Sequence, residues 1–172
     1  MNMLNPLDRS PRLAELKVSY RRRATSRGKQ PLSPCIVNSA HTAERYLRSV
    51  WDADKLELVE EVYVLCLNGA NEVIGWVCVS TGGFDRAVVD LRMVFGVALQ
   101  VASSAIVVAH NHPSGDVVPS REDRAVTAKL RAAGDVLNIP VLDHIILGKA
   151  DAFSFADDGF VQVGPRASLA AE

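Results

Sequence analysis

The run Ser104–His110 (SAIVVAH) constrains the fold of this chain more than any other segment, because its centre is apolar at every position and rich in valine and isoleucine. A run that does not alternate between apolar and polar residues predicts a short strand buried on both faces of a sheet. The chain is therefore expected to form a sheet on which helices pack.

The flanking segments predict the remaining elements. Residues 38–51 predict a helix with Ser39 as its N-cap. Two β-type runs, 62–67 and 72–80, flank an Asn-Gly turn and predict a hairpin. Two further helices are predicted from apolar stripes, the later one starting at Ser120; the stripes are Leu91, Val94, Phe95, Ala98, Leu99 and Ala102, then Val126, Leu130, Ala133 and Leu137. VLDHIIL and FSFADDGF predict the closing strands, so the fold class is α/β or mixed α+β.

Length and composition indicate one globular domain without a membrane-spanning helix. The chain has 172 residues, of which 48% are hydrophobic and 23% charged, as is typical of soluble proteins. The N-terminal residues contain no apolar signal region, and Cys35, Cys66 and Cys78 are odd in number without C-x-x-C spacing. These features predict a cytoplasmic protein with reduced thiols.

Charge is distributed unevenly along the chain. The first 30 residues hold eight Lys/Arg and two Asp/Glu, although the whole chain has a net charge of −1. This segment is either a solvated arm or a contact for nucleic acid or an acidic partner. The expected division is a basic, partly disordered N-terminal arm over 1–35, a domain over 36–165 and a C-terminal tail over 166–172.

The segment HNHPSGDVVPSRED carries the candidate site. His110 and His112 are residues i and i+2 of an extended segment, so both imidazoles point to one face, with Cα atoms about 6.6 Å apart. Asp123 follows in the first turn of the helix that starts at Ser120. Two histidines and one carboxylate leave a fourth zinc position for water, the ligand count of a catalytic site. Alternatively, Ser120 and Asp123 form only a capping box for that helix.

Taken as a whole, the arrangement His-x-His, seven residues, Ser, two residues, Asp resembles the signature of RadC-type proteins, a branch of the JAMM (MPN-type) zinc metallohydrolases. The resemblance covers roughly residues 36–162. It implies a JAMM/MPN-like, cytidine-deaminase-type mixed β-sheet with flanking helices. It further implies that His110, His112 and Asp123 bind Zn²⁺, and that Ser120 stabilises the oxyanion formed during attack on an amide carbonyl.

Members of this family use a glutamate as general base, in a pattern like E-x-Φ-x-Φ-L in which Φ is apolar. Here the pattern matches Glu60-x-Val62-x-Val64-Leu65 and favours Glu60 over its neighbour Glu61. Because strand side chains alternate, only one of the two can face the zinc. Without the metal motif, both would be explained as charges at a strand edge.

The resemblance implies a zinc-dependent metallopeptidase or isopeptidase-type hydrolase acting on a peptide or isopeptide substrate. Two alternatives stay open, a catalytically inert binding module of the same fold and a DNA-repair accessory protein that binds through the basic arm. His144 also matches a position where RadC-like sequences carry histidine. It either orients a metal ligand or is satisfied by backbone groups at the end of a strand.

Overall fold

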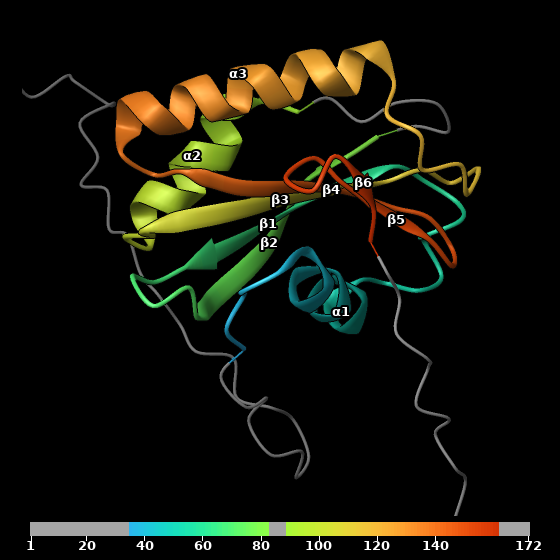
Figure 1. Ribbon diagram of the computed structural model, residues 1–172, viewed down its shortest axis with the longest axis horizontal. Coiled ribbons are helices and arrows are strands. Elements are labelled where there is room, and N and C mark those ends of the chain that lie inside the picture. Colours follow the sequence, from blue (N-terminus) through green and yellow to red (C-terminus); the bar gives the residue numbers. More distant parts are fainter. Residues whose placement is uncertain (1–34, 83–88, 162–172) are drawn as a thin grey trace, which may run out of the picture.

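The computed structural model describes residues 35–82 and 89–161, which form three helices and six strands (Figure 1). The elements are α1 Ala40–Val50, β1 Glu61–Leu67, β2 Val73–Thr81, α2 Leu91–Gln100, β3 Ala105–Asn111, α3 Arg121–Leu137, β4 Val141–Leu147, β5 Ala152–Ser154 and β6 Gly159–Phe160. The expected tail over 166–172, and the expected arm apart from residue 35, lie outside the described residues.

The six strands form one mixed sheet in the order β2-β1-β3-β4-β5-β6. Only β3 and β4 pair in parallel, and each other neighbouring pair is antiparallel. A parallel pair requires a crossover connection, and α3 supplies it. The expected mixed α+β fold is therefore confirmed.

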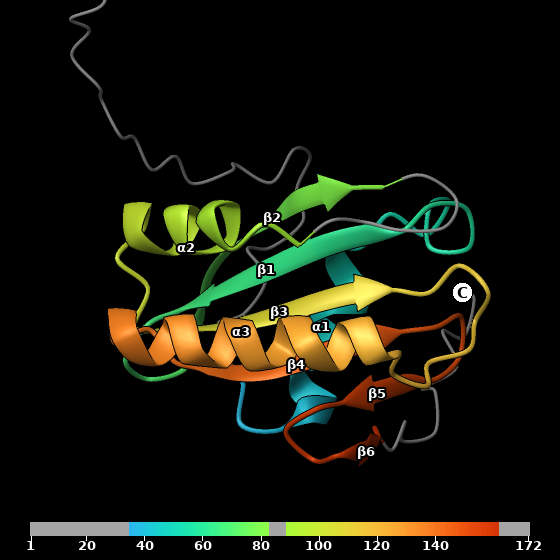
Figure 2. The same ribbon diagram turned by 90° about the horizontal axis from the view of Figure 1, so that it is seen from above.

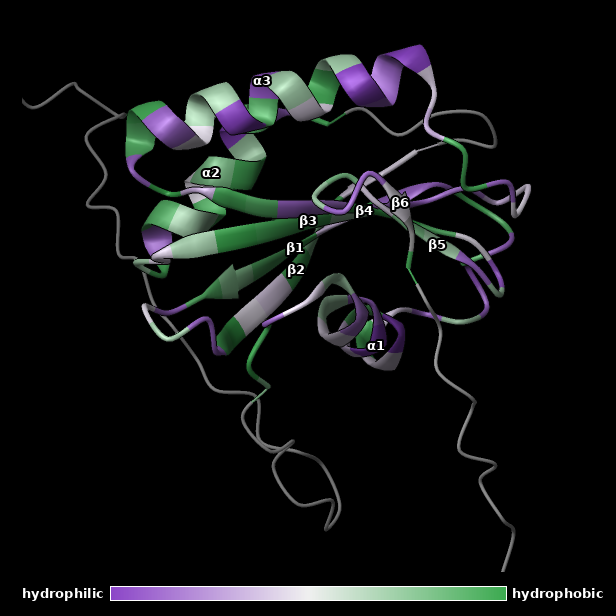
Figure 3. Cartoon of the chain, viewed as in Figure 1, coloured by the Kyte–Doolittle hydropathy of each residue, from purple (hydrophilic) through white to green (hydrophobic). Residues whose placement is uncertain are grey.

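Helices cover both faces of the sheet. α1 packs on one face, and α2 and α3 lie side by side on the other (Figures 1 and 2). Alternate residues of β1 and β3 divide between the two cores, and both strands are buried at every position. Figure 3 shows these strands as mainly hydrophobic ribbons. The α1 core includes Leu47, Tyr63, Leu65 and Val107, whereas the α2/α3 core includes Val62, Val64, Phe95, Val108 and Leu130.

Most predicted elements are confirmed with their caps. Ser39 and Ser120 cap α1 and α3, each within a capping box. The hairpin of β1 and β2 turns at the expected Asn-Gly segment. The stripe predicted for α2 runs too far, since Ala102 has a φ of 51° and Leu99 is 57% exposed. The helix ends there because Ser103 N–H donates to the Ala98 carbonyl at 2.9 Å, a Schellman-type closure.

The segment FSFADDGF differs from the prediction of one closing strand. It folds as the short hairpin of β5 and β6. Ser154 Oγ accepts from the backbone N–H groups of Ala156 and Asp157 at 3.2 and 3.1 Å, and Asp143 Oδ1 accepts from Ala156 N–H at 2.9 Å. These side-chain bonds compete with the ladder and end the strand after three residues.

Two further predictions concern membrane-spanning helices and the state of the cysteines. No helix among them is long and apolar enough to cross a membrane. All three cysteines are free thiols, and burial raises the pKa of the Cys66 thiol.

Candidate metal centre

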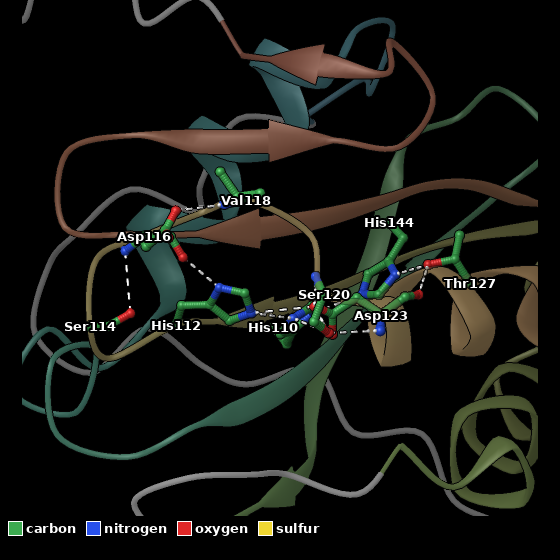
Figure 4. Close-up of polar contacts among 9 residues, drawn as sticks. All are labelled: His110, His112, Ser114, Asp116, Val118, Ser120, Asp123, Thr127 and His144. Carbon is green, nitrogen blue, oxygen red and sulfur yellow. Dashed lines mark hydrogen bonds and ion pairs between the residues drawn. The ribbon is translucent and has the colours of Figure 1, made fainter.

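Three element ends meet at the candidate site because of the sheet topology. The carboxyl end of β3 leads into the segment before α3, and the crossover helix α3 begins over that same end of the sheet. The amino end of β1 lies beside the carboxyl end of β3, since these two strands are antiparallel. Residues far apart in the sequence are thereby placed around one point (Figure 4).

The three expected ligands come together at this point. One ligand atom each from His110, His112 and Asp123 lies within 4.8 Å of the others. His110 Nε2 is 3.1 Å from His112 Nε2 and 3.2 Å from Asp123 Oδ1. His112 Nε2 is 3.6 Å from Asp123 Oδ2. The His110 side chain is buried, whereas those of His112 and Asp123 remain partly accessible.

The capping box and the cluster coexist, so the two interpretations of Ser120 and Asp123 are not exclusive. Asp123 Oδ2 accepts from Ser120 N–H at 2.8 Å and from the Ser120 hydroxyl at 2.6 Å. The hydroxyl accepts in turn from Asp123 N–H at 3.1 Å. Oδ2 thus serves the helix start while it also lies 3.6 Å from His112 Nε2, and Oδ1 faces His110.

The cluster shifts the pKa values of its members. Burial alone would raise the pKa of Asp123, but interactions with His110, His112 and Ser120 outweigh burial and hold that pKa well below its usual range. The hydrogen bond to Asp123 raises the pKa of His112, against the opposing effect of burial. Asp123 is therefore an anion at neutral pH, as a metal ligand must be.

A directional hydrogen-bond chain fixes the tautomer of His110. The Thr127 hydroxyl donates its single proton to the Asp123 carbonyl at 2.6 Å, so it can only accept from His144 Nδ1, also at 2.6 Å. His144 Nε2 therefore accepts from His110 Nδ1–H, at 2.8 Å. His110 Nε2 is left with its lone pair directed at the cluster. Burial lowers the pKa of His144 well below 6.5, which keeps this ring neutral.

His112 is oriented by a backbone carbonyl. Its Nδ1–H donates to the Asp116 carbonyl at 2.5 Å, which leaves the Nε2 lone pair free. The loop that carries Asp116 packs closely on the end of β4. A Cβ added at Gly148 would lie 2.7 Å from the Gly115 carbonyl oxygen, and Gly115 itself has a φ of +83°. Glycine is therefore required at both positions for this loop to dock.

These atoms fit a zinc ion. Two unprotonated nitrogens 3.1 Å apart repel each other unless a cation or a proton lies between them. Ligand atoms about 2.1 Å from one tetrahedral zinc lie about 3.4 Å apart. His110 Nε2 lies 3.1 Å from His112 Nε2 and 3.2 Å from Asp123 Oδ1, both close to that value. Two neutral imidazoles and one carboxylate are also a ligand set that zinc accepts.

The β1–β3 register places Glu60 on the same side of the sheet as the cluster. Val62 is opposite His110, so Glu60 is opposite His112 two residues further along. The Glu60 carbonyl accepts from Gly82 N–H at 2.8 Å, which continues the β1–β2 ladder by one residue. The negative charge of Glu60 contributes to the raised pKa of His112. Glu60 is not one of the three converging residues.

Glu61 lies on the opposite face. Its carboxylate is 1% exposed and accepts from Lys55 Nζ at 3.2 Å and Thr81 Oγ at 3.3 Å. It also adds to the burial effect that raises the pKa of Tyr63 to about 12. Tyr63 belongs to the core under α1. Between the two candidate bases, Glu60 is thus the one on the histidine side of the sheet.

Sequence reasoning missed Thr127 and Asn111 among the residues that surround the site. Thr127 follows Asp123 by four residues and so lies above it on the same helix face, a spacing that could have signalled the contact. Asn111 is a polar residue at a fully buried strand position, which is itself a signal. The Asp116 contact is made by backbone and has no signature in the residue types.

The chain is similar in sequence to known proteins. A family model described as the RadC-like JAB domain matches residues 37–160. UPF0758 proteins of Flavobacterium johnsoniae, Symbiobacterium thermophilum and Methanosarcina barkeri are 40%, 44% and 44% identical over 100, 103 and 103 residues. These segments make up 58%, 60% and 60% of this chain and 44%, 44% and 45% of the relatives. The matched region therefore spans less than half the length of these relatives.

Proposed function

Because the chain belongs to the RadC-like JAB domain family, we propose that it is a zinc-dependent hydrolase that cleaves amide bonds of the peptide or isopeptide type. The observation that carries this proposal is the convergence of His110 Nε2, His112 Nε2 and the Asp123 carboxylate, with Glu60 across the ladder from His112. A cytoplasmic location is part of the proposal and is supported by the three free thiols.

His110, His112 and Asp123 would hold the ion, and the hydrogen-bond chain through His144 and Thr127 keeps the His110 lone pair available to it. When bound, zinc lowers the pKa of water and polarises a carbonyl oxygen. Three protein ligands would leave the fourth position of a four-coordinate zinc for the oxygen of water or of the substrate. With two neutral imidazoles and one carboxylate, the ion and its ligands would keep a net positive charge, which would favour the oxyanion that develops as an amide is attacked.

Glu60 is assigned as the general base. It takes a proton from the attacking water and delivers it to the leaving nitrogen, since an amine leaves only after protonation. Its position one strand away from His112 suits this role, because the carboxylate is near the ligands without being one of them. Glu61 cannot share the task from the other face of the sheet.

Ser120 is assigned to the substrate carbonyl oxygen. Its hydroxyl is exposed and bound to Asp123 Oδ2 at 2.6 Å. The backbone N–H of Ser120 donates to the same oxygen, so Asp123 keeps a partner when the hydroxyl rotates away. A hydroxyl aimed at the developing oxyanion lowers the barrier to attack.

The proposal is tested by zinc content together with hydrolysis. Protein purified without added metal is subjected to elemental analysis as wild type, His112→Ala and Glu60→Ala. His41→Ala is the matched control, since His41 is a histidine of α1 on the far face of the sheet. We expect about one zinc per chain, lost only from His112→Ala.

The same four proteins are then assayed on fluorogenic peptide amides and on lysine-linked isopeptides. Hydrolysis should occur in wild type and His41→Ala and be lost in the other two. Zinc that survives His112→Ala would refute the assigned site. A zinc-loaded wild type with no hydrolysis in either substrate class would instead favour a binding module.

A further inference from the structure

Asn111 stands between the two histidines of the site, yet its side chain is turned to the other side of the strand. We propose that Asn111 is a positioning residue that sets the place of Glu60 by fastening the chain on both sides of it. This inference rests on the proposed role of Glu60 as the base. It assigns a function to the middle residue of the His-Asn-His segment.

Three hydrogen bonds carry the inference. Asn111 Nδ2 donates to the carbonyls of Leu56 at 2.8 Å and Val59 at 2.9 Å. Asn111 Oδ1 accepts from Glu61 N–H at 2.7 Å. The last two partners are the residues immediately before and after Glu60. The amide therefore holds the backbone on each side of the proposed base.

The hydrogen bonds also determine how the amide is oriented. Asn111 is fully buried, and its two N–H donors meet two carbonyls while its oxygen meets an N–H. Rotating the amide by half a turn would oppose like groups at all three contacts, which is costly in a buried site. Only one orientation of the amide therefore satisfies all three hydrogen bonds. We call Asn111 with these three bonds the clamp.

The fastened segment has little regular structure of its own. Residues 53–58 form turns between α1 and β1. Backbone bonds within the segment are local, from Lys55 N to Asp52 O at 3.0 Å and from Leu58 and Val59 N to Lys55 O at 2.9 and 3.1 Å. These bonds shape the turns but do not attach them to the sheet. Asn111 supplies attachments between the segment and β3.

The clamp ties the base to the ligands through one short piece of backbone. His110, Asn111 and His112 are consecutive, so the same strand end that aims two imidazoles at the metal on one side fastens the Glu60 segment on the other. A displacement of about 1 Å in a catalytic group can cost about a hundredfold in rate. A direct connection between ligands and base limits such displacements.

Two substitutions test the clamp. Asn111→Leu has a similar shape and removes all three bonds, whereas Asn111→Asp keeps the acceptor for Glu61 N–H and removes both donors. Asn68→Leu is the matched control. Asn68 caps the hairpin turn at the other end of β1, where its Oδ1 accepts from two backbone N–H groups at 2.9 and 3.0 Å.

Each variant is examined by zinc analysis, by hydrogen–deuterium exchange of the peptide covering 55–61, and by hydrolysis of the fluorogenic peptide amides and lysine-linked isopeptides used above. For both Asn111 variants we expect wild-type zinc content, at least tenfold faster exchange in 55–61, and kcat lowered tenfold or more with KM nearly unchanged. Asn68→Leu should speed exchange only around 68–72 and keep kcat within twofold.

A second comparison separates this inference from the proposed function. In a Glu60→Gln background, Asn111→Asp should lower the residual rate by less than twofold, because the group that it positions is already absent. Equal losses in both backgrounds, or unchanged exchange in 55–61, would overturn the clamp. If Glu60→Gln alone leaves the rate unchanged, the assignment of the base fails instead, and the exchange data still report whether Asn111 fastens the segment.

Discussion

The two faces of the β1–β3 ladder carry neighbouring polar residues in different surroundings. On the α2/α3 face, Glu60 lies across from His112, and His110 completes the row. On the α1 face, Glu61 and Asn111 are the corresponding pair, joined by a 2.7 Å hydrogen bond from Glu61 N–H to Asn111 Oδ1. Each face receives alternate residues of the same two strands, so one step along the chain separates a candidate site from a structural clamp.

Asn111 and the two histidines differ in how far the protein satisfies their hydrogen-bonding groups, rather than in polarity or burial. Asn111 is more deeply buried than His112, but both of its donors and its acceptor are used within the protein. His110 and His112 have one nitrogen each tied to the protein, and the other nitrogen faces a like atom. A site is indicated where lone pairs converge without enough protons to satisfy them.

Two aspartates illustrate the same contrast. Burial raises the pKa of Asp143, whose partners are the Ser154 hydroxyl and the Ala156 N–H. In Asp123 burial acts in the same direction, but two imidazoles and the Ser120 hydroxyl reverse the shift. Partial burial therefore does not by itself mark an aspartate as a ligand. The convergence of the two histidines does.

The strongest test of the contrast removes a histidine from each face. His110→Ala should lower zinc affinity by more than about a hundredfold, because it deletes a ligand outright and such a loss should exceed that of a ligand's supporting residue. His41→Ala on α1 should leave the affinity unchanged. Competition with a chromophoric chelator measures both. Comparable losses in the two variants would mean that zinc binds elsewhere.

The adjacent glutamates provide the next test. Glu60→Gln should lower kcat by about a hundredfold or more, the range of general-base catalysis, with zinc content unchanged. Glu61→Gln should lower it by less than about tenfold, since its carboxylate is on the other face. Steady-state kinetics on both variants measures this ratio. A larger loss in Glu61→Gln would exchange the roles of the two faces.

His144 tests whether the tautomer chain matters. His144→Leu should weaken zinc binding by about ten- to a hundredfold, as expected for loss of a residue that orients a ligand. His144→Gln should recover part of the loss, since its amide can accept from His110 and donate to Thr127. Nitrogen-15 NMR of the metal-free wild type should show His110 protonated at Nδ1. A proton found at Nε2 would contradict the chain.

The smallest expected effect is the pH dependence of zinc binding. The pKa of His112 is raised above 6.5 in the folded protein, and its protonated form cannot bind zinc. Apparent zinc affinity should therefore fall by about tenfold per pH unit below that pKa, one proton being displaced.

Without zinc, the stability of the fold should decrease as the pH rises, whereas zinc affinity increases. The charged His112–Asp123 contact stabilises the fold fully below pH 6.5 and is lost as pH rises through the raised pKa. Thermal melts with chelator and with zinc, in wild type and His112→Gln, would reveal the difference. Identical pH profiles for the two proteins would exclude His112 as the titrating group.

Residue types and spacing were sufficient to predict much of this protein. The periodicity of 38–51 and of the run from Ser120 predicted α1 and α3 with their caps, since helix starts are determined by local hydrogen bonds. The His-x-His spacing predicted that two imidazoles share a face. The end of α2 and the β5–β6 hairpin were not predicted, because a left-handed residue and side-chain bonds to backbone decide them.

The sequence by itself determined the mixed fold, because periodicity predicts its elements, and it named the candidate ligands and the candidate bases, because the pattern around His110 and Glu60 resembles a family signature. Tertiary structure alone decided which atoms meet. Only the antiparallel β1–β3 register puts Glu60 across from His112, and only the crossover through α3 brings Asp123 and Thr127 to His110 and His144. These contacts join segments separated by tens of residues, and no local pattern encodes such pairings.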